Sequence, residues 1–432
     1  MAVGRETQLK TRTRSDVQIP QRRALPSGLI DITLALGHLA IIATHAMTFG
    51  GSVFKDQEAF KKWFPKQSSP AHYVFNYGML GVEVFLFLSG FLACRALLRA
   101  QSMDGPRFSK REFYKHRLLR LYPTLLSTSL LTMLLRAAEN PKHVEMSAVL
   151  RDLTFTTNLY PASTAMNSML WSTAVDFQCY LLAPFALPLL QKLVLKSGIR
   201  PRSRYIAMII VASTAMRYFC NTFMDTALFK SLMDMATMRL YSSILFRSLP
   251  FVLGMLLYIN WDDRRSHPQT NTSNFMWVPY ALLMSPPVSE KLMQHFGYHY
   301  NEWLFVLLLP QFCGFAYHIL DTLFDLAPAW QSRFDVIATR GGFSWIARQS
   351  FTSYLLHSPI VGGIVIAAHG KAEGPPSYLP VMIVWVAASV ISLTVSWGFN
   401  QVVVGPIDKA LTGLTVGKDK RERREAGIKK DL

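Results

Sequence analysis

The sequence predicts an all-α integral membrane protein: a polytopic bundle of about ten transmembrane helices with its N-terminus and C-terminus in the cytosol. Three observations support this fold class. Hydrophobic residues make up 50% of the 432 residues and charged residues only 17%, whereas soluble proteins carry roughly 25% charged residues. The apolar residues gather in runs close to the length that crosses a bilayer. The 45 Lys and Arg, which outnumber the 27 Asp and Glu, concentrate in short segments between those runs.

The apolar runs define the expected spans, because a helix needs about 20 mainly apolar residues to cross the hydrocarbon layer. Runs near that length lie at 29–48, 74–98, 118–137, 168–190, 205–220, 243–260, 275–288, 303–320, 350–369 and 378–402. The fifth and seventh runs are short, and Pro286 and Pro287 interrupt the seventh. Each of these two is expected either to cross the membrane or to re-enter it from one side.

The basic residues give the spans a direction, because cytosolic loops of membrane proteins are enriched in Lys and Arg. The 99–117 and 191–204 loops are basic, whereas the 221–242 and 288–302 connections are close to neutral. We therefore expect three parts: a basic cytosolic segment at 1–27, a membrane domain at 28–410 and a basic cytosolic segment at 411–432. No connection is long enough to form a soluble nucleic-acid-binding domain, so nucleic acid is not expected as a partner.

The C-terminal segment ends in Lys429-Lys430-Asp431-Leu432, with lysines third and fourth from the end. This spacing resembles the cytosolic dilysine signal of endoplasmic reticulum membrane proteins, and a chance arrangement in a basic tail is the alternative. A location in the endoplasmic reticulum membrane is expected. The glycosylation sequon at Asn271 falls in a loop expected to be cytosolic, so it is expected to remain unmodified.

Ionisable side chains within the spans are candidates for function, because each costs at least about 2.5–3.5 kcal/mol at the membrane centre. The candidates are His38, His45, Glu83, Arg95, Asp176, Arg217, Arg247, His318 and His357. A helical rise of about 1.5 Å per residue places His45, Glu83 and Asp176 in the luminal half of the bundle. A carboxylate bonded to an imidazole makes a general base near neutral pH. The alternative is a buried polar network that holds helices together.

A second cluster leads into the third span at its cytosolic end. Its members are Arg111, Lys115, His116, Arg117 and Arg120. A helix N-terminus with adjacent basic side chains suits phosphate groups, whereas the alternative interpretation is membrane orientation plus contact with anionic lipid. The four cysteines lie singly in or beside apolar runs and predict neither disulfides nor a metal site. No metal cofactor is expected.

Four segments, in order along the chain, resemble the motifs of the acyltransferase-3 family. These segments are Tyr77–Leu92 (with Gly-Val-Glu and Ser-Gly-Phe), Phe113–Pro123, Trp171–Pro184 and Ser353–Pro359. Asp176 stands where bacterial members have Glu, as in the eukaryotic branch similar to nose-resistant-to-fluoxetine proteins. The resemblance covers nearly the whole membrane domain.

The resemblance implies a membrane acyltransferase that moves an acyl group, commonly acetyl, from acyl-CoA to a hydroxyl of a small-molecule, lipid or glycan acceptor. An acetyl-CoA-dependent O-acetyltransferase is the expected form. His45 matches the family's catalytic histidine, and Asp176 and Glu83 would orient or polarise that site. The CoA phosphates would bind the cytosolic cations Arg117, Arg120, Lys115 and Arg111.

One departure from the family pattern concerns the position eleven residues before His45. The family has an arginine there, and this chain has Leu34. Either another cation substitutes, with Arg95 or Arg247 as candidates, or catalysis is altered. This departure keeps open a catalytically silent relative with a scaffolding role. A proton-coupled transporter of a lipid or small molecule is a further hypothesis, in which the buried histidines and carboxylates act as a proton relay.

Overall fold

The computed structural model describes residues 25–64, 75, 77–102, 109–140, 144–160, 165–196, 199–223, 242–266, 276–296, 304–325, 328–373 and 375–410. The Asn271 sequon and the Lys429-Lys430 ending lie outside these residues. Within them the regular elements are helices, and the one β contact is an isolated bridge between Phe54 and Ala372. Eight described helices are long and apolar enough to cross a membrane, which confirms an all-α polytopic bundle.

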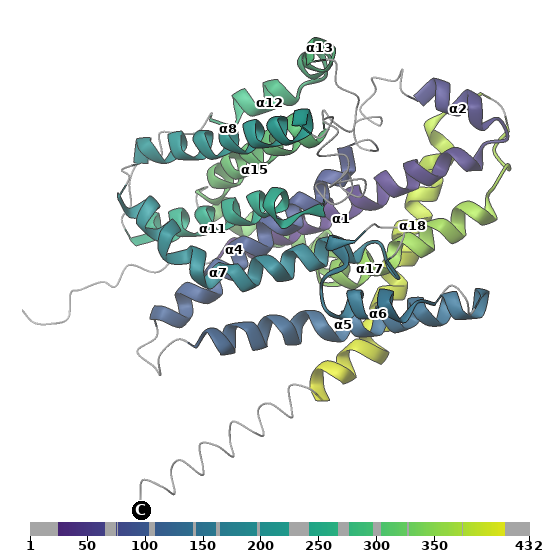
Figure 1. Cartoon of the computed structure of the whole chain (residues 1–432), viewed down its shortest axis with the longest axis horizontal. Coiled ribbons are helices and arrows are strands. Elements are labelled where there is room, and N and C mark those ends of the chain that lie inside the picture. Colours follow the sequence, from purple (N-terminus) through teal and green to yellow (C-terminus); the bar gives the residue numbers. More distant parts are fainter. Residues whose placement is uncertain are drawn as a thin grey trace, which may run out of the picture.

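The long helices lie side by side, and Figure 1 shows α8, α11, α7 and α5 stacked next to one another. They are α1 (Ser27–Gly50), α4 (Gly81–Ser102), α5 (Lys110–Glu139), α7 (Leu170–Lys196), α8 (Ile199–Phe223), α11 (Ile244–Ser266), α15 (Leu309–Phe324), α17 (Phe343–Ala367) and α18 (Tyr378–Phe399). The shorter helices are α2 (Gln57–Trp63), α6 (Met146–Leu153), α12 (Val278–Met284), α13 (Pro286–Phe296) and α16 (Pro328–Arg340). Two π-helical segments, η7 (Leu304–Leu308) and η8 (Asn400–Val404), adjoin α15 and α18.

Contacts at both ends show that α4 and α11 run in the same direction. Glu83 at the start of α4 pairs with Arg247 near the start of α11, and Phe91 packs on Trp261 near its end. Arg247 also lies over the ring of Trp171 at the start of α7, which is therefore parallel to both. Because α7 and α11 are parallel, the chain between them must cross back. The 25-residue helix α8 makes that crossing, which is one of the two outcomes expected for the short fifth run.

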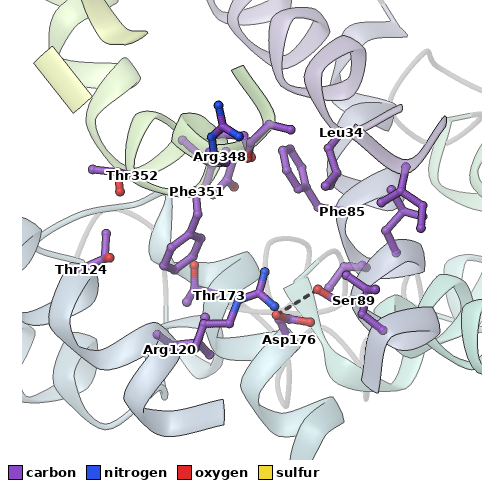
Figure 2. Close-up of a pocket in the computed structure, with 18 of the residues that line it drawn as sticks. Leu34, Phe85, Ser89, Arg120, Thr124, Thr173, Asp176, Arg348, Phe351 and Thr352 are labelled. Carbon is purple, nitrogen blue, oxygen red and sulfur yellow. Dashed lines mark hydrogen bonds between the residues drawn. The ribbon is translucent and has the colours of Figure 1, made fainter. Parts of the chain in front are cut away.

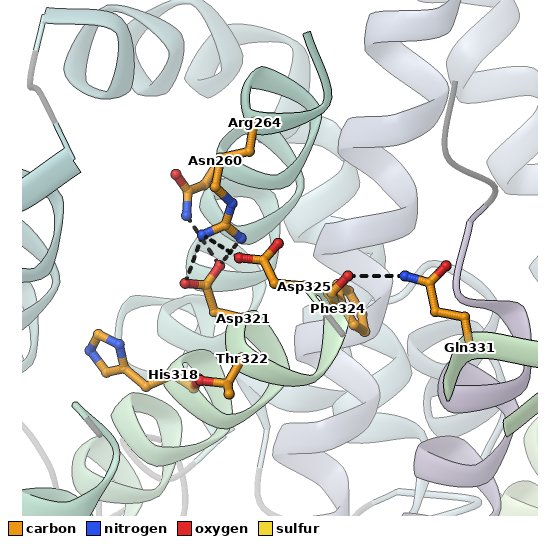
Figure 3. A network of polar contacts seen from close by, with 8 residues as sticks. All are labelled: Asn260, Arg264, His318, Asp321, Thr322, Phe324, Asp325 and Gln331. Carbon is orange, nitrogen blue, oxygen red and sulfur yellow. Dashed lines mark hydrogen bonds and ion pairs between the residues drawn. The ribbon is translucent and has the colours of Figure 1, made fainter. Parts of the chain in front are cut away.

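The helix α15 is also parallel to α11, and a polar network joins them at one end (Figure 3). Arg264 of α11 contacts both oxygens of Asp321 and lies 3.2 Å from Asp325 Oδ2. Between these helices the chain returns through α12 and α13, which meet at Ser285. The chain therefore crosses back through the broken seventh run, of which α12 runs alongside α15 while α13 is seen end-on in Figure 1. Together with α8, this return adds two passes to the eight described helices that are long and apolar enough to span a membrane, in agreement with the prediction of about ten.

The bundle has two ends, which we name the basic face and the opposite face. At the basic face α1 and α17 begin and α4, α7 and α11 end, so Lys192 near the end of α7 and Arg204 near the start of α8 lie there. The helix α16 also lies there, and its Asp335 accepts hydrogen bonds from Gly28 N (2.7 Å) and Ser27 Oγ (3.2 Å) at the α1 N-terminus. Because α18 ends at the same face, the two ends of the described chain lie on one side.

Candidate active site

A cavity of about 570 Å³ occupies the half of the bundle next to the basic face (Figure 2). Its walls come from α1, α4, α5, α7, α17 and η8, so it collects residues from distant parts of the sequence. Most of the wall is apolar, including Leu34, Phe85, Leu121 and Phe351. The cavity therefore offers an apolar slot that opens among the polar residues of one membrane face.

Four charged side chains line this cavity: Asp31, Arg120, Asp176 and Arg348. The hydroxyl of Ser89 on α4 donates to Oδ2 of Asp176 at 3.3 Å. In Figure 2 Arg120 of α5 points toward Asp176, and Arg348 of α17 lies on the far side of the cavity. Asp31 accepts a hydrogen bond from Ser344 Oγ at 2.6 Å, which ties the start of α1 to the start of α17. The cavity thus carries two guanidinium groups and two carboxylates, each of which accepts a hydrogen bond from a serine.

The four cations expected to bind phosphate do not share one place. Arg120 lines the cavity, whereas Arg117 is buried behind its wall and donates to the Leu92 carbonyl at 3.0 Å. Arg117 also lies over the rings of Phe113 and Tyr180, which fixes it in place. Lys115 lies 3.7 Å from Glu112 on the same helix. Arg111 is exposed and does not line the cavity.

Glu83 forms a buried ion pair with Arg247, and both side chains are almost fully enclosed. The pair joins the starts of α4 and α11. Neither Arg247 nor Arg95, the expected substitutes for the missing arginine at Leu34, lines the cavity. The cation that shares the cavity with Leu34 from the neighbouring helix is Arg348, which the sequence did not single out.

His45 lies near the opposite face, in contact with a second histidine. Its ring centroid is 4.8 Å from that of His357 on α17, with the ring planes at 64°, and it stacks on Phe49 at 6.1 Å. Seven residues before His45 on α1, toward the basic face, Nε2 of His38 and Oγ of Ser353 are hydrogen-bonded at 2.8 Å. The seam between α1 and α17 is therefore lined by three histidines.

The structure does not bring His45 and Asp176 together. Gly37 of α1 packs against Gly81 of the antiparallel helix α4. His45 is eight residues beyond Gly37, and Ser89, the partner of Asp176, is eight residues beyond Gly81 in the other direction. At about 1.5 Å per residue the two lie about 24 Å apart along the bundle. Glu83 lies between them, engaged with Arg247.

Two aromatic residues connect the cavity to the histidine seam. Phe85 lines the cavity, and its ring centroid is 6.4 Å from that of His38 and 6.1 Å from that of Tyr354. The Tyr354 hydroxyl accepts from Ser172 Oγ at 2.8 Å on the cavity wall, while its carbonyl bonds His357. The cavity and the seam are thus adjacent, and the side chains of Phe85 and Tyr354 lie between them.

The residues that sequence reasoning left without a role are Arg348, Ser353 and His357. For the seam a signal existed: Ser353 and His357 are four residues apart, and His38 and His45 are seven apart. Both spacings place their two residues on one face of a helix. For Arg348 we find no local signal, because its place depends on how α17 packs.

The cavity and the histidine seam belong to a region that matches a known protein family. The family described as "Acyltransferase domain" matches residues 30–401, a range that includes the seam and all of the cavity lining except Leu25 and Ser27. The chain belongs to the acyltransferase-3 family. The "Regulator of hypoxia-inducible factor 1" of Caenorhabditis elegans is 26% identical to this acyltransferase-3 protein over 349 residues, covering 76% of this chain and 68% of that protein. No solved structure matches this chain.

Membership in this family supports an acyl-transfer function for this multi-pass membrane protein. It gives no support to the transporter alternative. Among the described residues no three His, Cys, Asp or Glu side chains gather in a way that would hold a metal ion.

Proposed function

We propose that this protein is a membrane O-acyltransferase that moves an acyl group, with acetyl as the expected case, from acyl-CoA to a hydroxyl group. The acceptor would be a small molecule, a lipid or a glycan. The observation that carries the proposal is the cavity beside the basic face, in a chain of an acyltransferase family. Its arginines and its apolar walls suit a donor with phosphates at one end and a thioester arm at the other.

The donor would enter from the basic face. Arg120 and Arg348 would bind its phosphates, because a guanidinium group binds phosphate oxygens through paired hydrogen bonds. Arg117, Lys115 and Arg111 would add positive potential around that entrance. The thioester arm would lie along the apolar wall toward Phe85. Asp176, held by Ser89, would orient Arg120.

The chemistry would take place toward the histidine seam. His45 would draw the proton from the acceptor hydroxyl, whose oxygen attacks the thioester carbonyl. The new carbon–oxygen bond forms, the carbon–sulfur bond breaks, and the proton passes to the departing thiolate. Glu83 would support this site through the helices that its ion pair with Arg247 joins.

Donor binding is the first test, because it needs no knowledge of the acceptor. Acetyl-CoA should raise the melting temperature of the purified protein in nanodiscs. Arg120→Ala and Arg348→Ala should each weaken the acetyl-CoA affinity about tenfold, because each removes a charge-assisted contact. Arg333→Ala is the matched control, since Arg333 is exposed on α16 and lies over Trp330. Equal affinities in all four proteins would rule out the cavity as the donor site.

Acyl transfer is the second test. Microsomes containing the protein, given radiolabelled acetyl-CoA and a panel of terpenoid, sterol, sugar and lipid alcohols, should label one acceptor class. His45→Ala should abolish that labelling while leaving acetyl-CoA binding unchanged. Labelling that persists in His45→Ala would remove His45 from the proposal.

We also propose residence in the endoplasmic reticulum membrane, based on Lys429 and Lys430. Replacing both lysines by serine should move the tagged protein to later secretory compartments in immunofluorescence. An unchanged distribution would show that the two lysines are ordinary members of a basic tail.

A further inference from the structure

The seam between α1 and α17 carries buried polar atoms that the proposed function has not used. Nδ1 of His45 and Nε2 of His357 are both buried and have no hydrogen-bond partner among the described residues. A buried, unpaired nitrogen costs about 1–3 kcal/mol, so native proteins rarely keep two of them side by side without a use. The two rings are in contact, at a centroid distance of 4.8 Å.

The tautomer of His357 follows from its other nitrogen. Nδ1 of His357 lies 2.6 Å from the carbonyl oxygen of Tyr354. A carbonyl only accepts hydrogen bonds, so Nδ1 carries the proton and donates it. In the neutral ring Nε2 then has no proton and is an acceptor. His357 therefore presents a basic nitrogen in the immediate surroundings of His45.

The titratable groups that the structure places beside the His45–His357 pair are imidazoles and not carboxylates. Asp176 is about 24 Å from His45 along the bundle, and Glu83 is paired with Arg247. The groups that act electrostatically on His357 are His45 and His38. The helix α18, which packs against α1 and α17, has the apolar side chains Val381 and Val384 beside the α1 residues that flank His45. The described surroundings thus provide no carboxylate to stabilise a protonated His45.

We propose that His357 is the proton partner of His45, in place of the carboxylate that a histidine base commonly has. This proposal rests on the proposed acyl transfer. His45 takes the acceptor's proton on one ring nitrogen and shares the proton on its other nitrogen with Nε2 of His357. The acceptor oxygen bonds to the acyl carbon, the carbon–sulfur bond breaks, and the pair returns the proton to the thiolate. The products are the acyl ester and CoA thiol, and the pair is left neutral.

Such a pair has a property that a single histidine lacks. Two imidazoles in contact in a low-dielectric site hold at most one extra proton between them, because two like charges repel strongly there. Their protonation is then a property of the pair and not of either ring. Changing His357 must therefore alter how His45 titrates, even though His45 itself is unchanged.

The test compares His357→Gln with His318→Gln. His318 is the matched control, because it is also a buried membrane histidine but lies on α15, stacked on Tyr280 at 5.5 Å. His357→Gln should lower kcat about 10²- to 10⁴-fold, the usual contribution of a general acid–base group. The KM for acetyl-CoA should stay unchanged, and the pH–rate profile should move. His357→Glu, which restores a proton acceptor beside His45, should recover part of kcat with a different pH profile.

A second readout needs no acyl transfer. In protein labelled with ¹⁵N-histidine, the titration midpoint of His45 should move by about one pH unit or more in His357→Gln and stay in place in His318→Gln. An unmoved midpoint would overturn the pairing. If His357→Gln moves the His45 midpoint but the wild-type protein transfers no acyl group, the pairing stands and the proposed function is refuted. Equal loss of kcat in His357→Gln and His357→Glu with an unchanged pH profile would show that His357 only supports the helices.

Discussion

At the scale of single residues, Glu83 and Asp176 show how alike two positions can look in a sequence and how differently they are placed. Each is a lone carboxylate in an apolar span. In the structure Glu83 is buried against Arg247, whereas Asp176 lines a cavity and accepts from Ser89. The first environment is that of a structural ion pair and the second that of a ligand-facing group.

This difference predicts opposite effects of the same kind of substitution. Glu83→Gln leaves the Arg247 charge buried and uncompensated, and breaking a buried pair in this way costs about 3–5 kcal/mol. Asp176→Asn keeps the Ser89 contact, so we expect its thermal unfolding in detergent to remain near that of wild type while acetyl-CoA binding weakens. Unfolding curves and donor titrations of both variants check this. A destabilised Asp176→Asn beside an unaffected Glu83→Gln would reverse the two roles.

At the scale of elements, the closest helix contact is that of α4 with α11. A Cβ added to Gly90 would collide with the Phe251 carbonyl, and one added to Gly254 would collide with the Phe87 carbonyl. Small residues at such crossings let two backbones approach closely within a membrane. This contact sets the distance between the helices that carry Glu83 and Arg247.

We therefore expect Gly90→Ala to destabilise the protein by several kcal/mol, in the range of overpacked or strained cores. Gly362→Ala is the matched control, because no atom of a neighbouring segment lies within 4 Å of the position that its Cβ would take, and Gly362 is in the interior of α17. That control should be neutral or should stabilise by about 0.5–1 kcal/mol. Thermal unfolding in micelles measures both, and a loss confined to Gly362→Ala would contradict this account of the α4–α11 contact.

The short helix α6 depends on a buried carboxyl at its end. Asp152 accepts hydrogen bonds from Thr157 Oγ1 (3.0 Å) and Asn167 N (3.2 Å), which tie α6 to the segment before α7. Burial raises the pKa of Asp152 from 3.8 to about 6, against the opposing effect of those hydrogen bonds. A carboxyl with a raised folded-state pKa contributes stability that is full below pH 3.8 and is lost as the pH rises through about 6.

Wild-type stability should accordingly fall between pH 4 and pH 6.5 by up to about 3 kcal/mol from this group. Asp152→Asn removes the titration, so its unfolding free energy should change less over the same interval. Denaturant unfolding at several pH values, with Thr157→Val as a variant that removes one hydrogen bond but keeps the carboxyl, measures the difference. A pH dependence identical in wild type and Asp152→Asn would contradict the assignment to Asp152.

At the scale of the whole molecule, the directions of the described helices leave the two ends of the described chain on one side. The basic face is expected to be cytosolic, because Lys and Arg are enriched there. In intact microsomes a membrane-impermeant thiol reagent should label Lys192→Cys, at the basic face, and should reach Lys371→Cys, at the opposite face, only after permeabilisation. Wild type is the control, since Cys94, Cys179 and Cys313 are buried and Cys220 is half-buried. Labelling of Lys371→Cys in intact microsomes would invert the orientation.

The sequence by itself determined the fold class, the eight long crossings and the family. Apolar run length and the placement of Lys and Arg are local properties, so they can be read without knowing how the helices pack. The short fifth run and the broken seventh run needed the structure, because only the parallel directions of α7, α11 and α15 show that the chain must cross between them. The seventh run is interrupted at Ser285, so its continuous apolar length is too short for the sequence alone to show that it crosses.

Only the tertiary structure decided which of the ionisable residues meet. Sequence position gives the place of each residue within its own apolar run but not the level at which that helix packs against its neighbours, so residues at similar places in their runs can lie far apart along the bundle. His45, Glu83 and Asp176 therefore separate into three places, with His357, Arg247 and Ser89 as their partners. Packing also placed Arg348 in the wall of the cavity that Leu34 lines. The local pattern of a helix fixes what crosses the membrane, and the level and rotation at which each helix packs against the others fix what its charges can do.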